Sequence, residues 1–398
     1  MMSVSQERMS DREIGERLRF AREEAKKTQA DAAEVIGAAR TTVVAIEQGQ
    51  RRVRIDELQK LAAAYGTSAN AILRREAVQL SLAPQFRKLS ESEDGAIEAA
   101  SRLLSNLVTA ELELESALGV RRERRYPPER PILPGDNRAI VAQAEADAQD
   151  FRDWLGLGPG PIGDIVSLLD LQLGIRVYLC PLNSKISGLF AYDERAGACM
   201  LLNALHPRAR LVTTAAHELG HFMSSRSDPE VLTEDTPIIS RKERYADSFG
   251  RGFVMPARAV RQRFQDITAG HSHLTRRHVI LLAHAFGVAR EAMVRRLEEL
   301  ALARRGTWDW FQANGGITDE QAQQVLGALP SSHFPASDVG RQLPPRLALL
   351  TGEAWKRGIY SEGQLVRLLN LDRHSVRALL DSMVAEEGEE DELVRLPR

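Results

Sequence analysis

The stretch TTAAHELGHFM, residues 213–223, places two histidines and a glutamate in an otherwise small and apolar segment. On an α-helix, residues four apart differ by about 40° around the axis, so His217 and His221 lie on one face in successive turns. The flanking residues are typical of a buried helix, where a charged Glu218 without a partner would cost on the order of several kcal/mol. The stretch therefore predicts a buried helix whose polar side chains hold a divalent metal ion.

A third protein ligand is required, because a catalytic zinc ion keeps three protein ligands and leaves one position for water. The segment RKERYADSFGRGFVMP, residues 241–256, has a helical pattern and contains Glu243 and Asp247 four residues apart. Glu243 can coordinate the ion, while Asp247, one turn later, can hydrogen-bond a ligating imidazole. Two histidines and one carboxylate accept several divalent ions, so we expect one ion, zinc first and manganese as the alternative.

A second pattern, over residues 10–75, is a run of short segments with apolar residues at helical spacing. Gly37, Gly49 and Gly66 stand where these helices should end. The pattern predicts a compact all-helical domain at the start of the chain. Its local surface should be basic, because Glu47 is the only acid between Arg40 and Arg54.

Composition limits the compartment and the partners. The chain has 53 Lys and Arg against 55 Asp and Glu, so its bulk charge does not indicate a nucleic-acid partner. It shows neither a secretory leader nor an apolar run long enough for a bilayer, so we expect a soluble, cytoplasmic protein without a membrane partner. Its two cysteines, Cys180 and Cys199, lack the spacing of a zinc site and cannot form a disulfide framework, so we expect them to pack as small apolar residues.

The rest of the chain predicts a mainly α protein with one α+β part. The segments IRVYLC, GLFAYD and ACMLLN have the composition of short strands and precede the HELGH helix, while amphipathic helices flank them on both sides. Residues 121–135 are basic and rich in proline, which excludes a continuous helix and indicates a linker or domain edge. We therefore predict an all-helical domain at 10–75, a helical connector and linker at 76–135, an α+β domain at 136–300 and a helical region at 301–398 with an acidic tail.

HELGH followed by ERYAD is similar to the HExxH and ExxxD motifs of the gluzincin metallopeptidases, and resembles most closely the ImmA/IrrE family. The resemblance covers about residues 140–300, and includes the order of the strands, the HELGH helix and the closing MP. It implies a zincin-like domain in which His217, His221 and Glu243 hold the metal. It also implies that Glu218 is the general base that takes a proton from water on the metal. The group that would stabilise the oxyanion is not assigned, and the candidates are Tyr192, His206 and Tyr245.

The segment TQADAAEVIGAARTTVVAIEQGQR resembles the XRE-type helix-turn-helix of lambda-type repressors. In that fold the second helix lies in the major groove of double-stranded DNA, and flanking residues contact phosphates. The resemblance implies that base edges face Arg40, Thr41, Thr42 and Ala45. It implies phosphate contacts for Gln29, Arg51, Arg52 and Arg54.

Such domains usually pair on two half-sites, so we expect a homodimer. Residues 97–119 are first expected to form a connecting helix packed on its neighbours. A dimerising helix is the alternative, and this segment is the candidate for the dimer contact.

Together the two resemblances predict a DNA-binding, metal-dependent endopeptidase that regulates transcription. Its protein substrate would be a repressor-type transcription factor, cleaved in a stress or mobile-element response. The alternative is an XRE-type regulator or antitoxin whose metallopeptidase-like domain acts as a sensor or docking module without catalysis. For the helical domain alone, a role in protein–protein contact is the alternative to DNA binding.

Overall fold

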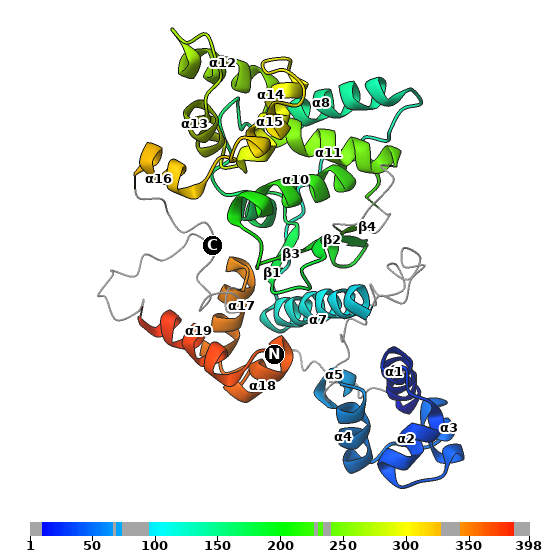
Figure 1. Ribbon diagram of the computed structural model, residues 1–398. Coiled ribbons are helices and arrows are strands. Elements are labelled where there is room, and N and C mark those ends of the chain that lie inside the picture. The colour runs from blue at the N-terminus through cyan, green and yellow to red at the C-terminus, as the bar shows by residue number, and fades with distance from the viewer. Residues whose placement is uncertain are drawn as a thin grey trace. The chain divides into compact units, whose positions relative to one another are not determined.

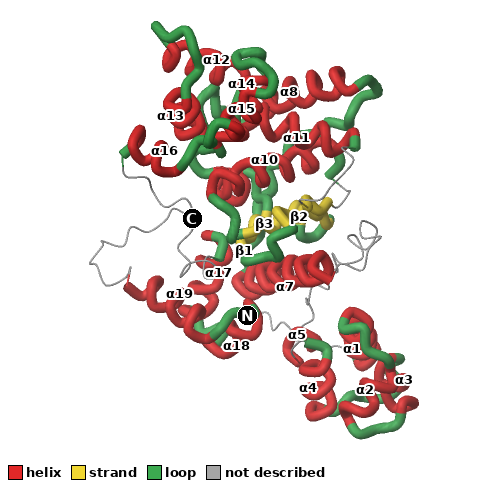
Figure 2. Tube along the Cα trace, in the orientation of Figure 1, coloured by secondary structure: helices red, strands yellow, loops and turns green. Residues whose placement is uncertain are grey.

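The computed structural model describes residues 10–66, 69–73, 95–226, 230–233, 240–327 and 343–385. The chain divides into two compact units, one comprising residues 1–79 and 363–371 and the other comprising residues 80–362 and 372–398. Helices dominate both units, and strands occur only in the second among the residues described (Figures 1 and 2). The predicted mainly α fold with a small sheet is thus confirmed. Over the same residues, no helix has the length and apolar character needed to cross a bilayer.

The first unit is the predicted all-helical domain. Its helices are α1 (Asp11–Glu24), α2 (Gln29–Ile36), α3 (Arg40–Glu47), α4 (Ile55–Ala64) and α5 (Ala69–Leu73). Ser10 and Thr28 cap α1 and α2 by accepting hydrogen bonds from backbone N–H groups of the first turn. The glycines expected at helix ends, Gly37, Gly49 and Gly66, have φ values of 66°, 70° and 72°, which only glycine adopts readily. Leu18, Val43, Ile46, Leu58 and Leu61 fill the core between these helices.

The second unit is built on a four-stranded sheet in the order β1 (Arg176–Cys180), β3 (Gly197–Asn203), β2 (Ile186–Asp193) and β4 (Glu230–Thr233). β1 runs parallel to β3, and β2 runs antiparallel to both β3 and β4. The first three strands were predicted. β4 was missed because a four-residue strand is too short to show alternation in the sequence.

Two helices cover opposite faces of this sheet. Phe222 of α10 (Arg208–Ser224) packs against Phe190 of β2 with ring centroids 6.2 Å apart. On the other face, the Tyr178 hydroxyl of β1 donates a 2.7 Å hydrogen bond to Glu111 of α7 (Gly95–Leu118). Figure 1 shows the sheet between α7 and α10. α11 (Arg241–Val254) packs on α10, and α8 (Asn137–Trp154) packs on α11, so the HELGH helix lies in the middle of the unit.

The later helices join the second unit at two separate places. α12 (Ala257–Thr268), α13 (Arg276–Phe286), α14 (Arg290–Glu299), α15 (Thr307–Ala313) and α16 (Asp319–Leu326) form one group, in which Trp308 and Phe311 pack against Val279 and Val294. α17 (Pro345–Lys356) packs on α7, and α19 (Arg373–Ala385) packs on α17. α18 (Glu362–Leu369) falls almost entirely in the range assigned to the first unit. The described helices of the predicted region 301–398 therefore bury their apolar faces in different places.

The predicted connector and the segment expected to be a linker or domain edge span residues 76–135. Residues 76–94 lie outside the described residues. The prolines do prevent a helix over 121–135, but this extended segment is bound to the second unit along its length. Tyr126 accepts a 3.0 Å hydrogen bond from the Ala198 N–H of β3, and the Arg130 N–H donates to the Met223 carbonyl of α10 at 2.6 Å. Sequence composition alone does not reveal such backbone contacts.

α7 is the segment that was considered for a dimer contact. Leu104, Leu107 and Leu114 are at most 5% exposed within this single chain, where α7 packs against the sheet and α17. The structure therefore shows the connecting helix packed on its own neighbours that was first expected. The apolar face that suggested dimerisation is already covered, and the homodimer stays a prediction without an assigned contact.

Three arginines and three carboxylates form a buried ion cluster on the α7 side of the sheet. Arg122 pairs with Glu111 at 2.5 Å and with Asp170 at 2.6 Å. Arg176 of β1 pairs with Glu111 at 2.6 Å and with Glu115 at 2.8 Å. Burial opposes ionisation of Glu111, but the charges of Arg176 and Arg122 outweigh it and lower the pKa of this carboxyl. The cluster thus ties α7, the extended segment and β1 together.

Arg346 extends the ion cluster to α17 through a 3.0 Å pair with Glu115. Its side chain is less buried than those of Arg122 and Arg176. We expect Arg122→Ala to lower the free energy of unfolding by about 3–5 kcal/mol, because Glu111 and Asp170 stay buried and lose a shared partner. Urea unfolding followed by circular dichroism measures this change.

The matched control is Arg125→Ala, three residues along the same extended segment. The Arg125 side chain is exposed, and among the residues that the structure describes it forms an ion pair only with exposed Glu123, at 3.1 Å. Its removal should leave the free energy of unfolding nearly unchanged, since exposed pairs contribute little. Equal urea midpoints for the two variants would contradict a stabilising role for the buried cluster.

Candidate metal centre and candidate nucleic-acid interface

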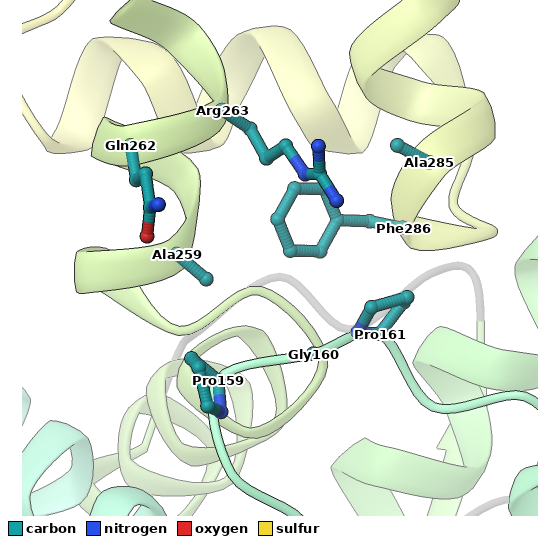
Figure 3. A pocket seen from close by; sticks show the side chains of 8 residues that line it. All are labelled: Pro159, Gly160, Pro161, Ala259, Gln262, Arg263, Ala285 and Phe286. Carbon is teal, nitrogen blue, oxygen red and sulfur yellow. The ribbon is translucent and has the colours of Figure 1, made fainter. Parts of the chain in front are cut away.

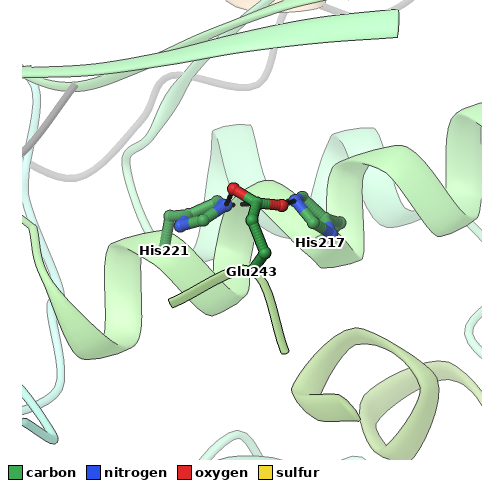
Figure 4. Close-up of side chains that lie close together, drawn as sticks. All are labelled: His217, His221 and Glu243. Carbon is green, nitrogen blue, oxygen red and sulfur yellow. Dashed lines mark hydrogen bonds and ion pairs between the residues drawn. The ribbon is translucent and has the colours of Figure 1, made fainter. Parts of the chain in front are cut away.

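α10 and α11 bring the two histidines and the downstream glutamate together. His217 and His221 lie on one face of α10, as their spacing predicted, with their Nε2 atoms 3.0 Å apart. Ser240 caps α11 by accepting a hydrogen bond from the Glu243 N–H, so Glu243 stands in the first turn of that helix. Its Oε2 lies 3.3 Å from His217 Nε2 and its Oε1 lies 3.4 Å from His221 Nε2 (Figure 4).

The three side chains suit a divalent ion. In a tetrahedral shell with metal–ligand bonds of about 2.0–2.1 Å, neighbouring ligand atoms are about 3.3 Å apart. The two Nε2 atoms are 3.0 Å apart, and each lies 3.3 or 3.4 Å from its nearer Glu243 oxygen, which is close to this spacing. One ligand atom from each residue lies within 4.8 Å of the other two. Over the residues that the structure describes, no other group of His, Cys, Asp or Glu has ligand atoms this close together. The donor set and its spacing therefore fit the metal that the sequence predicted.

Small residues set the distance between α10 and α11. A Cβ added at Gly220 would lie 2.6 Å from Ala246 Cα, and one at Gly250 would lie 3.0 Å from the Ala216 carbonyl carbon. Real Cβ atoms do not approach a backbone this closely without moving it. Any larger residue at these positions would push α11 away from α10, and Glu243 would move with it.

Asp247 orients one of the two imidazoles. It follows Glu243 by one turn, and its Oδ1 lies 2.9 Å from His217 Nδ1, so the proton on Nδ1 is fixed and Nε2 faces the other ligands. Burial opposes protonation of His217, but hydrogen bonds to Asp247 and Glu243 outweigh it and raise its pKa to about 10. Burial, together with the charge of His217, lowers the pKa of His221 well below its ordinary value. A metal ion would therefore displace a proton from His217 but not from His221.

Glu218 is fully buried beside this group. Its carboxylate is directed toward the sheet, where a Cβ added at Gly188 of β2 would lie 3.0 Å from Oε1. It thus lies next to the predicted ligands in the sequence and between α10 and β2 in the fold. The sequence identified Glu218 from its motif, but contained no signal for the strand that faces it.

The oxyanion candidates are not equally placed. Tyr245 is buried and its hydroxyl donates a 2.8 Å hydrogen bond to Asp147 of α8, on the side of α11 away from Glu243 and Asp247. It is therefore part of the core and not of the ligand group. His206 lies beside Asn203 at the end of β3, with His206 Nε2 3.5 Å from Asn203 Nδ2. None of the described contacts brings Tyr192 or His206 to the three ligands.

The cysteines and a pocket lie apart from the ligands. Both cysteines are free, and burial raises the pKa of each thiol to about 12, in keeping with the predicted packing role. A pocket of about 210 Å³ lies between the loop at residues 159–161, α12 and the end of α13 (Figure 3). Arg263 and Phe286 line it, but none of the three candidate ligands does.

In the first unit, a buried ion pair organises the candidate nucleic-acid interface. Arg22 of α1 donates to Glu47 at 2.6 Å, and Glu47 also accepts a 3.0 Å hydrogen bond from the Gln29 side chain. Gln29 in turn accepts from the Arg40 guanidinium at 3.3 Å. Glu47 was counted as a surface acid from the sequence, but only 3% of its side chain is exposed. It therefore fixes Gln29 and Arg40 and does not reduce the positive charge of the surface.

The other predicted DNA contacts differ in their exposure. The exposed residues are Arg40, Thr41, Arg52 and Arg54, while Gln29, Thr42, Ala45 and Arg51 are partly buried. Arg51 already donates two hydrogen bonds, of 3.1 and 2.9 Å, to Glu57 of α4. This internal partner was not visible in the sequence, and a phosphate would have to share Arg51 with it.

Two parts of the chain match known families. Residues 18–72 match the helix-turn-helix family, and residues 171–298 match the IrrE N-terminal-like domain, a peptidase family. The second match spans the sheet, α10 and α11, and so includes all three candidate ligands. No curated protein matches the chain. The chain therefore joins an N-terminal helix-turn-helix of the XRE type to an IrrE-like domain of a metallopeptidase family.

Proposed function

We propose that this protein is a DNA-binding, metal-dependent endopeptidase that regulates transcription by cleaving a repressor-type protein. One observation carries the proposal: His217, His221 and Glu243 have the spacing of a metal ligand set, with Glu218 buried next to them. The two domain matches support a regulator with a peptidase-like domain. Catalysis and the nature of the substrate go beyond those matches and belong to the proposal.

Each residue of the site has a role in peptide hydrolysis. The Nε2 atoms of His217 and His221 and the Glu243 carboxylate would hold one divalent ion, zinc or alternatively manganese. Such an ion supplies Lewis acidity, which polarises the scissile carbonyl and lowers the pKa of water. Glu218 would take the proton that water loses as its oxygen bonds to the carbonyl carbon. It would then pass this proton to the amide nitrogen as the C–N bond breaks.

The helix-turn-helix would bring this activity to its substrate. A domain that binds an operator places the peptidase near other proteins bound to the same DNA, which raises their effective concentration. A transcription factor, cleaved in a stress or mobile-element response, is therefore the substrate class that we propose. Dimerisation on two half-sites is part of the proposal, through a surface other than the covered face of α7.

A regulator without catalysis is the second candidate. The observation that favours it is the pocket beside Arg263 and Phe286, which is separate from the ligands and could take an effector. In that case the metal would be structural, and Glu218 would have no chemical role. The variants Glu218→Gln and His217→Ala separate the two candidates.

We expect Glu218→Gln to bind metal as the wild type does and to cleave no protein, because the amide cannot accept the proton from water. His217→Ala should lose both metal and cleavage. The measurement is incubation of metal-loaded protein with purified repressors encoded nearby, followed by mass spectrometry of the products.

Cleavage by Glu218→Gln at the wild-type rate would reject the assigned base. Absence of cleavage by the wild type would reject the proposed substrate class. Normal gene regulation in cells with Glu218→Gln, but altered regulation with His217→Ala, would favour the sensor.

We expect Arg40→Ala and Arg52→Ala each to weaken DNA binding, because both guanidinium groups are exposed on the predicted interface. The slope of log K against log salt is negative, and a lost phosphate contact should make it less steep by about 0.9. Arg12→Ala is the matched control, since Arg12 is exposed on α1 and pairs with Glu16 at 3.1 Å. Fluorescence anisotropy at several salt concentrations measures both quantities. Equal effects of all three variants would reject the assigned interface.

A further inference from the structure

We infer that Gly188 is a positioning residue for Glu218, and this inference rests on the proposed function. Because Gly188 has no side chain, strand β2 can lie directly against the carboxylate and set where that carboxylate stands relative to the metal ligands. Neither sequence motif includes Gly188, and the residue does not touch the three ligands in the described contacts.

The space around Gly188 is filled on three sides. A Cβ at this position would lie 3.0 Å from Glu218 Oε1, 3.0 Å from Thr214 Cγ2 and 3.3 Å from Leu202 Cδ2. Gly188 is not among the glycines with positive φ, so its backbone conformation is open to any residue. The requirement for glycine is therefore one of space and not of conformation.

The backbone of β2 cannot move away to make room. Gly188 pairs with Leu202 of β3 on one side and with Leu232 of β4 on the other. One residue earlier, the Ser187 hydroxyl accepts a 3.0 Å hydrogen bond from Arg210 of α10, which holds the strand to the helix. The pairing with β4 shifts register between Ile186 and Gly188, a local irregularity of the kind found beside active sites.

An added methyl group must therefore displace a side chain. Leu202, Thr214 and Glu218 are all buried. The Glu218 carboxylate is the end of a longer chain with more rotatable bonds, so it can adjust more easily than the branched Leu202 and Thr214 side chains. We expect the carboxylate to shift by some tenths of an ångström. Misplacement of a catalytic group by about 1 Å can cost about 100-fold, so a loss of about tenfold is expected for this smaller shift.

The test uses a probe that depends on Glu218 but needs no peptide substrate. Acetohydroxamate binds a metal ion through its two oxygens and can donate a hydrogen bond to a neighbouring carboxylate. Its affinity for the zinc-loaded full-length protein is measured by calorimetry for the wild type, Gly188→Ala, Glu218→Ala and the double variant. Gly163→Ala is the matched control, because a Cβ there meets nothing within 4 Å and the residue has no positive φ.

We expect Gly188→Ala to bind zinc normally and to bind acetohydroxamate about tenfold more weakly, with Gly163→Ala unchanged. In the Glu218→Ala background the added methyl has no carboxylate to displace, so its effect should fall to about twofold or less. A glycine needed only for packing would instead produce the same loss in both backgrounds. If the single variant Gly188→Ala does not fold, the double variant with Glu218→Ala should recover folding, because one of the two 3.0 Å contacts of the added methyl group is then gone.

Three results would overturn the inference. They are unchanged affinity in Gly188→Ala, equal losses in the two backgrounds, and wild-type binding of acetohydroxamate that does not depend on Glu218. If the wild-type protein cannot be loaded with zinc, that result contradicts the metal site of the proposed function itself, before the role of Gly188 is tested. The two failures are thus distinguishable.

Discussion

The close crossing of α10 and α11 is the contact on which the metal centre depends. Packed helices are usually separated by 8–10 Å, according to the side chains between them. Here Gly220 meets Ala246 and Gly250 meets Ala216, so backbone approaches backbone. At this separation the Glu243 carboxylate reaches both imidazoles. Phe222, Phe249 and Phe253 are fully buried around the crossing. The burial of each ring stabilises the fold by about 1.5–3 kcal/mol, which offsets the cost of enclosing the polar ligands.

The two faces of the sheet are held by different forces. On the α10 side the contacts are mainly apolar, and they surround the polar side chains that the proposed chemistry requires. On the α7 side, Arg122 and Arg176 share buried carboxylates with one another. Buried ion pairs add little net stability but are costly to break singly, so they favour one arrangement over its alternatives. The ion cluster therefore fixes how α7 and α17 are joined to the sheet that carries Gly188.

The sequence predicted the features that depend on local spacing. Residues four apart share a helix face, which identified His217 with His221 and Glu243 with Asp247 as pairs. Glycines just after helix ends and short apolar strand segments are also signals carried by neighbouring residues. The helical unit and three of the four strands could therefore be predicted.

Features that depend on contacts between distant residues could not be predicted. Arg22 and Glu47 are 25 residues apart, and Arg176 and Glu115 are 61 apart. Nothing in either segment indicates its partner. The extended segment at 121–135 was interpreted as a linker because its prolines exclude a helix, whereas its backbone hydrogen bonds attach it to the second unit. Gly188 lies in a strand that was predicted, but its approach to Glu218 exists only once β2 and α10 are packed.

Metal content decides whether His217, His221 and Glu243 form a metal site. Mass spectrometry of the purified full-length protein should find about one divalent ion per chain, and both His217→Ala and Glu243→Ala should lose it, because each variant removes one of three ligands. Wild-type protein that holds no metal even after reconstitution, or variants that retain a full equivalent, would contradict the site and with it the proposed peptidase.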